Sequence, residues 1–195
     1  MSDLEQPRAR KRAAGRLIEL VQTIVLTVVI FLVIQTFVAR PFKIEGGSME
    51  TTLLPNQYVL IDKITPHWAR YERGDIIVLE PPRAEVGGDQ TPFIKRVIGL
   101  GGDRIELHSG KVFVNGTVID EPYIYTENGI QQPTDPTPGG LSEWLVPDGE
   151  LFVMGDHRQN SADSRTFGPI EVAHVIGRAW LRYWPIDTFG VVAPS

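Results

Sequence analysis

The chain has 195 residues, of which 42% are hydrophobic and 22% charged, a composition typical of a folded protein rather than a disordered one. It contains no cysteine, which excludes disulfides and thiolate metal sites. Residues 41–195 hold 13 Lys/Arg against 21 Asp/Glu, and this acidic balance argues against a nucleic-acid-binding surface.

The N-terminal part combines a basic cluster with a long uncharged run. The uncharged run is LVQTIVLTVVIFLVIQTFVA at residues 20–39. In a helix, these 20 residues would rise about 30 Å, which matches the hydrocarbon core of a bilayer. We therefore predict a transmembrane anchor helix over residues 17–39, with a buried helix of a soluble protein as the alternative. Five basic residues precede it: Arg8, Arg10, Lys11, Arg12 and Arg16.

The flanks of this run favour an uncleaved anchor over a cleavable signal peptide. The run is longer than the roughly 7–15 apolar residues of a signal peptide, and Phe37 stands where a cut site needs a small residue. Because more basic residues precede the run than follow it, the positive-inside rule predicts a cytoplasmic N-terminus. Residues 1–16 would then be cytoplasmic, and residues 40–195 would form an extracytoplasmic domain beside the lipid of the cell membrane.

The rest of the chain is typical of a β domain. The segment KVFVNGTVID at 111–120 predicts a hairpin, because Asn115-Gly116 favours the positive φ angles of a two-residue turn. The stretches 81–92 and 127–143, rich in Pro and Gly, are predicted to be surface loops. We therefore predict a mainly β fold, an irregular antiparallel domain preceded by one transmembrane helix. Six further runs have strand composition: 57–64, 75–80, 93–100, 103–109, 150–156 and 175–184.

Aromatic residues gather on the last predicted strand. Trp180, Tyr183 and Trp184 are predicted to be core residues. If they are exposed, the alternative is that they dock the domain at a membrane interface.

Ser48 follows Gly46 and Gly47 and lies nine residues beyond the predicted anchor. Two glycines before a serine can expose its hydroxyl, or they can simply form a turn. A serine hydroxyl is a weak nucleophile and needs a neighbouring base. None of the four histidines stands in a Ser-His-Asp or HExxH pattern, although His157 lies in the polar stretch GDHRQNSADSR.

Lys95 is the better candidate for the base. It lies in TPFIKRVIGL at 91–100, so on a strand its side chain can point into apolar surroundings. Desolvation disfavours the ammonium form and lowers a lysine pKa towards the range of a general base. The alternative is that Lys95, like Arg96, extends to solvent as an ordinary surface residue.

Four segments in one order resemble the bacterial type I signal peptidases, which are membrane-bound Ser/Lys proteases. SMETTL at 48–53 is similar to the family's Ser-Met-x-Pro-Thr-Leu box, and RGDIIVL at 73–79 is similar to its Arg-Gly-Asp-Ile-Val strand. KRVIGLGGD at 95–103 is similar to the Lys-Arg-Val-x-Gly-x-x-Gly-Asp box. GDHRQNSADSR at 155–165 is similar to Gly-Asp-Asn-x-x-x-Ser-x-Asp-Ser-Arg. Thr51 and Gly101 replace prolines that are frequent in the family, and neither replacement removes a reacting group.

The resemblance implies roles for these residues. Ser48 would attack the scissile carbonyl, and Lys95 would take its proton. Ser161 would orient the lysine through a hydrogen bond. The Ser48 N–H would form part of the oxyanion hole, whereas Gly46 stands where the family often has a side-chain hydroxyl as second donor. Four charged residues would brace the site through ion pairs: Asp156, Arg158, Asp163 and Arg165.

The resemblance also implies shallow apolar pockets that admit only small side chains. The expected activity is therefore a serine endopeptidase of the signal-peptidase type that cleaves signal peptides from exported preproteins after Ala-x-Ala-like ends. No metal or other cofactor is expected, and the implied partners are preproteins, membrane lipid and export machinery nearby. Two alternatives remain, a Ser/Lys self-cleaving regulator and a non-catalytic membrane-tethered β binding module. The residues that match pocket positions are Phe42, Ile44, Met49, Leu53 and Ile94.

Overall fold

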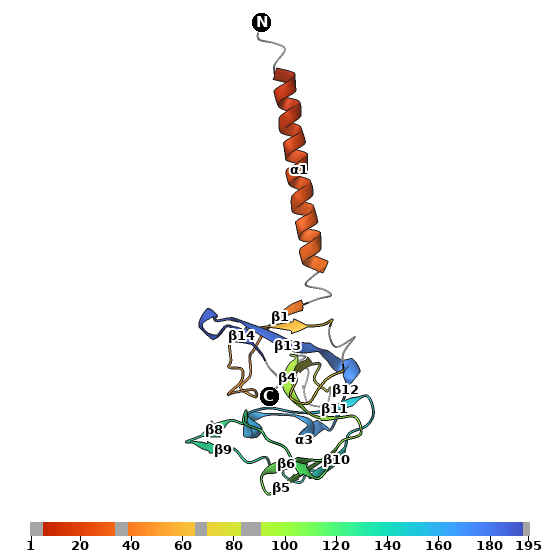
Figure 1. The fold of residues 1–195 in the computed structure, drawn as a ribbon, viewed down its shortest axis with the longest axis vertical. Coiled ribbons are helices and arrows are strands. Elements are labelled where there is room, and N and C mark those ends of the chain that lie inside the picture. Colours follow the sequence, from red (N-terminus) through yellow and green to blue (C-terminus); the bar gives the residue numbers. More distant parts are fainter. Residues whose placement is uncertain (1–5, 34–38, 65–69, 83–90, 193–195) are drawn as a thin grey trace. The chain divides into compact units, whose positions relative to one another are not determined.

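The structure, a computed structural model, describes residues 6–33, 39–64, 70–82 and 91–192. The chain divides into two compact units, Met1–Ala39 and Arg40–Ser195. The first consists mainly of one helix. The second contains the β-strands, except that Ala39, the first residue of the first strand, belongs to the first unit (Figure 1).

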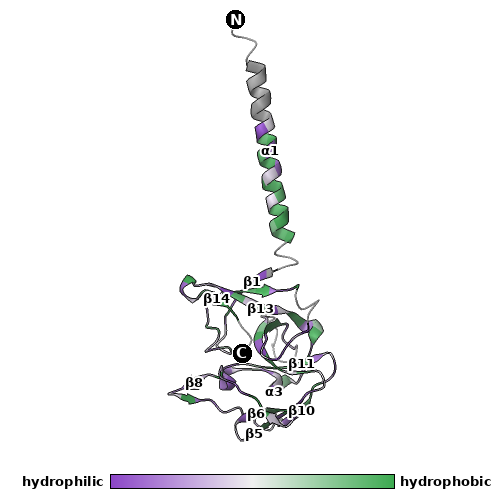
Figure 2. Cartoon of the chain, viewed as in Figure 1, coloured by the Kyte–Doolittle hydropathy of each residue, from purple (hydrophilic) through white to green (hydrophobic). Residues whose placement is uncertain are grey.

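The first unit contains helix α1 (Gln6–Val33). From Gly15 to Val33 it is long and apolar enough to cross a membrane, and each of these side chains is exposed. Figure 2 shows most of this stretch in green, with purple and pale bands between the green turns. The helix begins earlier than predicted, because the Ala-, Arg- and Lys-containing segment before it also favours helix. Ala39 was predicted to end the helix but begins strand β1, and residues 34–38 lie outside the described residues.

The second unit is built on a large sheet with strand order β1-β2-β13-β3-β4-β11-β12, and β14 pairs with β13. From β2 onward its paired strands run antiparallel. The strands of this sheet are β1 (Ala39–Lys43), β2 (Tyr58–Asp62), β3 (Ile76–Leu79), β4 (Phe93–Leu100), β11 (Glu150–Met154), β12 (Ile170–Glu171), β13 (Val175–Trp184) and β14 (Gly190–Val191).

Two smaller antiparallel sheets complete the unit, with orders β10-β5-β6-β7 and β8-β9. Their strands are β5 (Arg104–His108), β6 (Lys111–Val114), β7 (Thr117–Val118), β8 (Thr126–Glu127), β9 (Ile130–Gln131) and β10 (Glu143–Leu145). The short helices are η2 (Arg158–Asn160), α3 (Ser164–Phe167), η3 (Val172–His174) and η4 (Ile186–Thr188).

These elements confirm the predicted mainly β class with one N-terminal apolar helix. A strand occupies each of the six predicted runs, and Asn115 (φ 53°) and Gly116 (φ 78°) form the predicted turn between β6 and β7. The interpretation of 127–143 as loop was incomplete, since this stretch contains β9, the last residue of β8 and the first residue of β10. Asn128-Gly129 forms a second turn of the same kind, but its flanking strands are too short and polar to give a strand signal. Of the other predicted loop, residues 83–90 lie outside the described residues.

The prediction that Trp180 and Trp184 are core residues is wrong. Their side chains are 51% and 55% exposed. Ala179 is buried in the apolar cluster beside β2 and β3, and because successive residues of a strand face opposite sides, Trp180 points away from that cluster. Tyr183 is half-buried, with its ring centroid 6.0 Å from that of Tyr58.

A core aromatic next to the smaller sheet offers a test of this packing. Phe152 on β11 is fully buried, and its ring lies 5.0 Å from that of Trp144. Phe152→Ala should lower the free energy of unfolding by about 3–5 kcal/mol, because it removes buried apolar surface and leaves a cavity. Leu145→Ala, at a 71% exposed side chain on β10, should change it by less than about 0.5 kcal/mol. Chemical unfolding followed by circular dichroism measures both. Equal effects of the two substitutions would contradict the packing described.

Candidate active site

Ser48 lies in a tight turn between β1 and β2. The Glu50 N–H donates to Gly47 O at 3.1 Å, and the Leu53 N–H donates to Met49 O at 2.8 Å. Thr51, in place of the family's usual proline, has a φ of 91°. A proline ring fixes φ near −65°, so proline could not occupy position 51 of this turn. Threonine in place of proline at position 51 therefore goes together with a positive φ angle that proline cannot adopt.

Strand β4 brings Lys95 to the serine. Lys95 Nζ lies 2.8 Å from Ser48 Oγ, and its side chain is only 4% exposed. Nζ also lies 5.1 Å from the centroid of the Phe93 ring, and Ser48 Oγ lies 3.5 Å from Ile94 O. Residues 47 positions apart in the sequence thus form a directly hydrogen-bonded pair.

Burial lowers the pKa of the Lys95 ammonium from its ordinary value of 10.5 to about 8. Desolvation is the largest cause. The carboxylates of Asp163 and Asp156 act in the opposite direction, and the Arg165 guanidinium adds to the lowering. A lysine with this pKa is partly neutral near neutral pH, which is the condition for accepting a proton from a hydroxyl.

A cleft of about 260 Å³ opens beside the pair. Its lining includes Phe42 and Ile94, together with the backbone of Gly46 and Gly47. The expectation that Ile44, Met49 and Leu53 line it is wrong, because all three are fully buried in the same apolar cluster as Ile94. They support the cleft wall from the core. Large hydrophobic side chains are buried where they can be, and these three pack into the apolar cluster rather than facing the cleft.

The two glycines differ in what they allow. A Cβ atom on Gly46 would meet nothing within 4 Å, whereas one on Gly47 would lie 2.9 Å from Glu50 Oε1 and 3.1 Å from Asn160 Nδ2. A side chain at position 47 would therefore displace the ends of the Glu50 and Asn160 side chains, whereas one at position 46 would meet open space. Within the described part of the chain, the Ser48 N–H has no hydrogen-bond acceptor, so it is available to a substrate.

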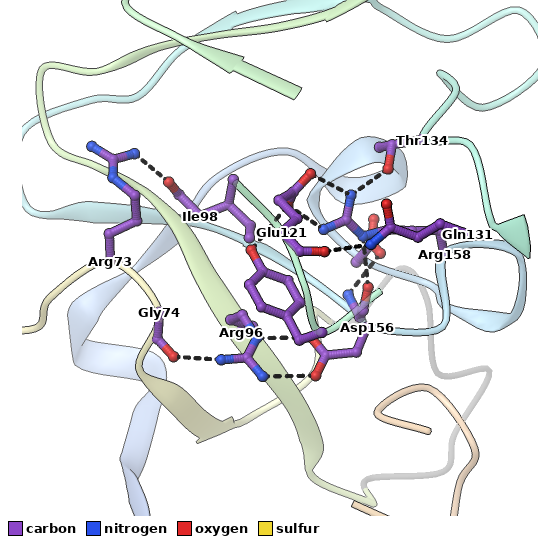
Figure 3. Close-up of polar contacts among 12 residues, drawn as sticks. Arg73, Gly74, Arg96, Ile98, Glu121, Gln131, Thr134, Asp156 and Arg158 are labelled. Carbon is purple, nitrogen blue, oxygen red and sulfur yellow. Dashed lines mark hydrogen bonds and ion pairs between the residues drawn. The ribbon is translucent and has the colours of Figure 1, made fainter. Parts of the chain in front are cut away.

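An ion pair buried next to the hydrogen-bonded Ser48 and Lys95 joins β4 to the turn after β11. Arg96 donates to Asp156 through Nε and Nη2, both at 2.8 Å, and both side chains are at most 1% exposed (Figure 3). Thr52, in the serine turn, donates to Asp156 Oδ2 at 2.6 Å. Asp156 was predicted as a bracing residue, but its partner Arg96, 60 positions away in the sequence, was not predicted.

The other three predicted bracing residues are also buried and paired. Arg158 pairs with Glu121, which sequence reasoning missed, and also contacts Thr134 (Figure 3). Arg165 donates to Asp163 from Nε at 2.8 Å and from Nη2 at 2.9 Å. Asp163 also accepts the Gly155 N–H at 3.1 Å. This bond connects the Arg165–Asp163 pair to the residue that follows β11.

The predicted hydrogen bond from Ser161 to Lys95 is not formed. Ser161 Oγ is buried and has no hydrogen-bond partner among the described residues, whereas Lys95 Nζ bonds to Ser48. Ser161 Oγ lies instead close to Gly155, where a Cβ atom would be 2.4 Å from it and 2.5 Å from Ser48 O. Ser161 is therefore packed against the backbone of residue 155.

The three histidines that the structure describes take no direct part in this pair. The His157 ring bonds Glu50 and stacks on Tyr125, and His108 stacks on Phe113. His174 ends η3 away from the cleft lining, and His67 lies outside the described residues. The described residues contain no group of three or more His, Asp or Glu side chains that could hold a metal ion.

A serine hydroxyl bonded to a buried lysine, on a mainly β domain, is an arrangement suited to a serine peptidase. The family model "Signal peptidase, peptidase S26" matches residues 17–184. The chain is 39% identical to a signal peptidase I of Leptolyngbya laminosa over 97% of this chain and 91% of that protein. It is 32% identical to signal peptidase I S of Bacillus subtilis (strain 168), over 88% and 91%.

A crystal structure of a signal peptidase I from Enterococcus faecalis V583 is also similar, with 30% identity, a TM-score of 0.45, and coverage of 56% of this chain and 97% of that chain. The family match and the relatives together show that this chain belongs to the signal peptidase family, peptidase S26. It is accordingly a hydrolase of the serine peptidase class.

The position of Lys95 generates a prediction that requires no substrate. With the five lysines labelled at ¹³Cε, one NMR resonance should titrate with a midpoint of about pH 8 and be missing from Lys95→Met. Because the folded-state pKa lies below the unfolded value of 10.5, the buried ammonium destabilises the fold by about 3 kcal/mol below pH 8. That cost disappears as the pH rises from 8 to 10.5. Titration of Lys95 only above pH 10 would contradict the burial described.

Proposed function

We propose that this protein is a membrane-anchored endopeptidase that removes signal peptides from exported preproteins with a Ser48/Lys95 dyad. Membership of the signal peptidase family supports cleavage of signal peptides. The single observation that supports the dyad is the 2.8 Å contact between Lys95 Nζ and Ser48 Oγ, made by a lysine that burial keeps partly neutral.

The reaction needs only side chains and water. Neutral Lys95 takes the Ser48 hydroxyl proton as Oγ attacks the scissile carbonyl, and the resulting ammonium donates that proton to the leaving amine. This gives an acyl ester on Ser48 and releases one peptide product. Lys95 then takes a proton from water, the hydroxide attacks the ester, and Ser48 Oγ recovers its proton from the lysine as the second product leaves.

The oxyanion of each tetrahedral intermediate would be stabilised by the Ser48 N–H, which has no other acceptor within the described residues. Gly46 contributes no side-chain donor. A second donor would therefore come from the backbone or from water.

Substrate selection would follow from the small apolar cleft. On its wall, Ile94 belongs to the buried apolar cluster that contains Ile44, and Phe42 packs against this cluster, so the wall would not recede to admit large side chains. An extended substrate with alternate small residues, such as Ala-x-Ala, would fit with its backbone along a strand edge. Preproteins that carry signal peptides are thus the proposed partners, with the export machinery nearby as their source.

The buried ion pairs Arg96–Asp156, Arg158–Glu121 and Arg165–Asp163 would act as bracing for the dyad rather than in the chemistry. The first joins β4, which carries Lys95, to the segment after β11, and the other two hold residues of that same segment. Their burial makes the loss of a single partner costly, because the remaining charge would have no counter-ion.

The proposed anchor is α1, with residues 1–16 in the cytoplasm and residues 40–195 outside. Its exposed apolar side chains over Gly15–Val33 support a lipid environment. In the second unit, exposed Trp180, Trp184 and Phe189 would contact the interfacial region of the bilayer, where tryptophan is enriched.

Cleavage of a synthetic preprotein whose signal ends in Ala-x-Ala tests the enzyme proposal. Detergent-solubilised protein should cut once after the second alanine, as mapped by mass spectrometry. Ser48→Ala and Lys95→Ala should each lower the rate by about 10³-fold or more, since they remove the nucleophile and its base. Below about pH 8 the wild-type rate should fall roughly tenfold per pH unit as Lys95 becomes protonated.

Lys111→Ala, at an exposed lysine on β6, is the matched control and should cut at the wild-type rate. Cutting that survives Lys95→Ala would exclude the dyad. Cleavage only of the protein's own chain would favour a self-cleaving regulator, and no cleavage in active lipid conditions would favour a binding module.

Membrane orientation can be tested with single cysteines, because the natural chain has none. Ser142→Cys should react with an impermeant maleimide in intact cells, and Ser2→Cys should react only after permeabilisation. Each labelled band is detected on a gel. The opposite pattern would invert the proposed topology, and labelling of both sites in intact cells would contradict a membrane-spanning α1.

A further inference from the structure

We propose that the contact between Glu50 and His157 is a latch that holds the Ser48 backbone in its catalytic orientation. The latch residues are positioning residues, and this inference rests on the proposed Ser48-dependent cleavage. His157 Nδ1 lies 2.8 Å from Glu50 Oε2, and the two side chains are 15% and 29% exposed.

Glu50 and His157 each hold one of the two peptide groups that flank Ser48. The Glu50 N–H donates to Gly47 O at 3.1 Å, which fixes the peptide before Ser48. The His157 N–H donates to Ser48 O at 3.0 Å, which fixes the peptide after it. The side-chain contact joins the two holding residues, so these three contacts and the chain between Gly47 and Glu50 form a closed ring around Ser48.

The orientation of the Ser48 N–H follows from this ring. In a trans peptide, the C=O and N–H groups point in opposite directions. Because Gly47 O faces the Glu50 N–H inside the turn, the Ser48 N–H on the same peptide faces away from the turn. This N–H is the proposed oxyanion donor, and a preorganised donor loses its value when its direction is not fixed.

A second layer holds the His157 ring. The ring stacks on Tyr125, with centroids 4.0 Å apart and an angle of 8° between the planes. The Tyr125 N–H donates to Asp156 O at 3.0 Å, so the stacking residue is attached to the segment that it supports. On the other side, Glu50 Oε1 is packed towards Gly47, where a Cβ atom would lie only 2.9 Å from it. Any side chain at position 47 would therefore displace the latch.

The contact requires a hydrogen on Nδ1 and an acceptor on Glu50, but no positive charge on the ring. A neutral imidazole in its Nδ1–H form donates to the carboxylate as an imidazolium does. An asparagine at 157 places its amide nitrogen at the position of Nδ1, and asparagine is the residue in the family motif that the segment 155–165 resembles. Asparagine should therefore replace histidine here, whereas phenylalanine keeps the ring without the donor.

The variants His157→Asn, His157→Phe and Glu50→Leu, measured in the full-length protein with the synthetic preprotein, test the latch. His157→Phe should lower kcat by about 10- to 100-fold with KM within threefold, because the donor acts in the transition state more than in binding. His157→Asn should stay within about threefold of wild type. Glu50→Leu should match His157→Phe, and the double variant should lose no more than either single one. Thermal unfolding confirms that each variant is folded at the assay temperature.

His108→Phe is the matched control, because His108 also stacks on an aromatic ring, that of Phe113 at 3.7 Å, but lies on β5 in a smaller sheet. It should leave kcat unchanged. A kcat of His157→Phe equal to wild type overturns the latch, and so does a His157→Asn variant as impaired as His157→Phe. If His157→Phe does not fold, Glu50→Leu decides, since Glu50 is a partly exposed turn residue. If the Ser48→Ala variant cleaved the preprotein at the wild-type rate, the proposed function itself would be overturned.

Discussion

The burial of Lys95 against Ser48 is the constraint on which the rest of the site depends. A lysine in water would remain an ammonium at neutral pH and could not take a proton from serine. Burial alone would produce a neutral lysine anywhere in a core, but here two carboxylates, Asp156 and Asp163, lie close enough to favour the charged form. The site must therefore keep these carboxylates while limiting their effect on Lys95.

The arginines resolve this conflict. Arg96 forms a two-point contact with Asp156, and Arg165 forms one with Asp163, so each carboxylate already has a counter-ion. A paired carboxylate exerts a weaker field on Lys95 than a free one. Because adjacent residues of β4 face opposite sides, one strand presents Lys95 to the cleft and Arg96 to the aspartate behind it. The ion pairs thus help to set the basicity of the lysine as well as the shape of the site.

Much of this arrangement could be predicted from the sequence, and the part that could not has a common cause. The six strand runs follow from local patterns, and the proposed nucleophile and base follow from local patterns and from motif resemblance. Arg96, Glu121 and Glu50 were missed as partners because they are 60, 37 and 107 positions from the residues they contact. Sequence patterns do not indicate which strands become neighbours. Likewise, Ile44, Met49 and Leu53 are buried in one cluster with residues of β2, β3, β4 and β13, and no local pattern specifies this grouping.

Thr51 shows how this chain keeps its nucleophile turn rigid without the proline frequent in the family. A β-branched residue at φ 91° is strained, so the turn must be held by its surroundings. Thr52 supplies part of that hold, since its hydroxyl bonds Asp156 and its carbonyl accepts from Arg182 at 3.1 Å. On the other side of Thr51, Glu50 bonds His157. The strained residue is therefore bracketed by two fixed neighbours, and the rigidity that a proline ring would provide comes instead from contacts with β13 and with the segment that follows β11.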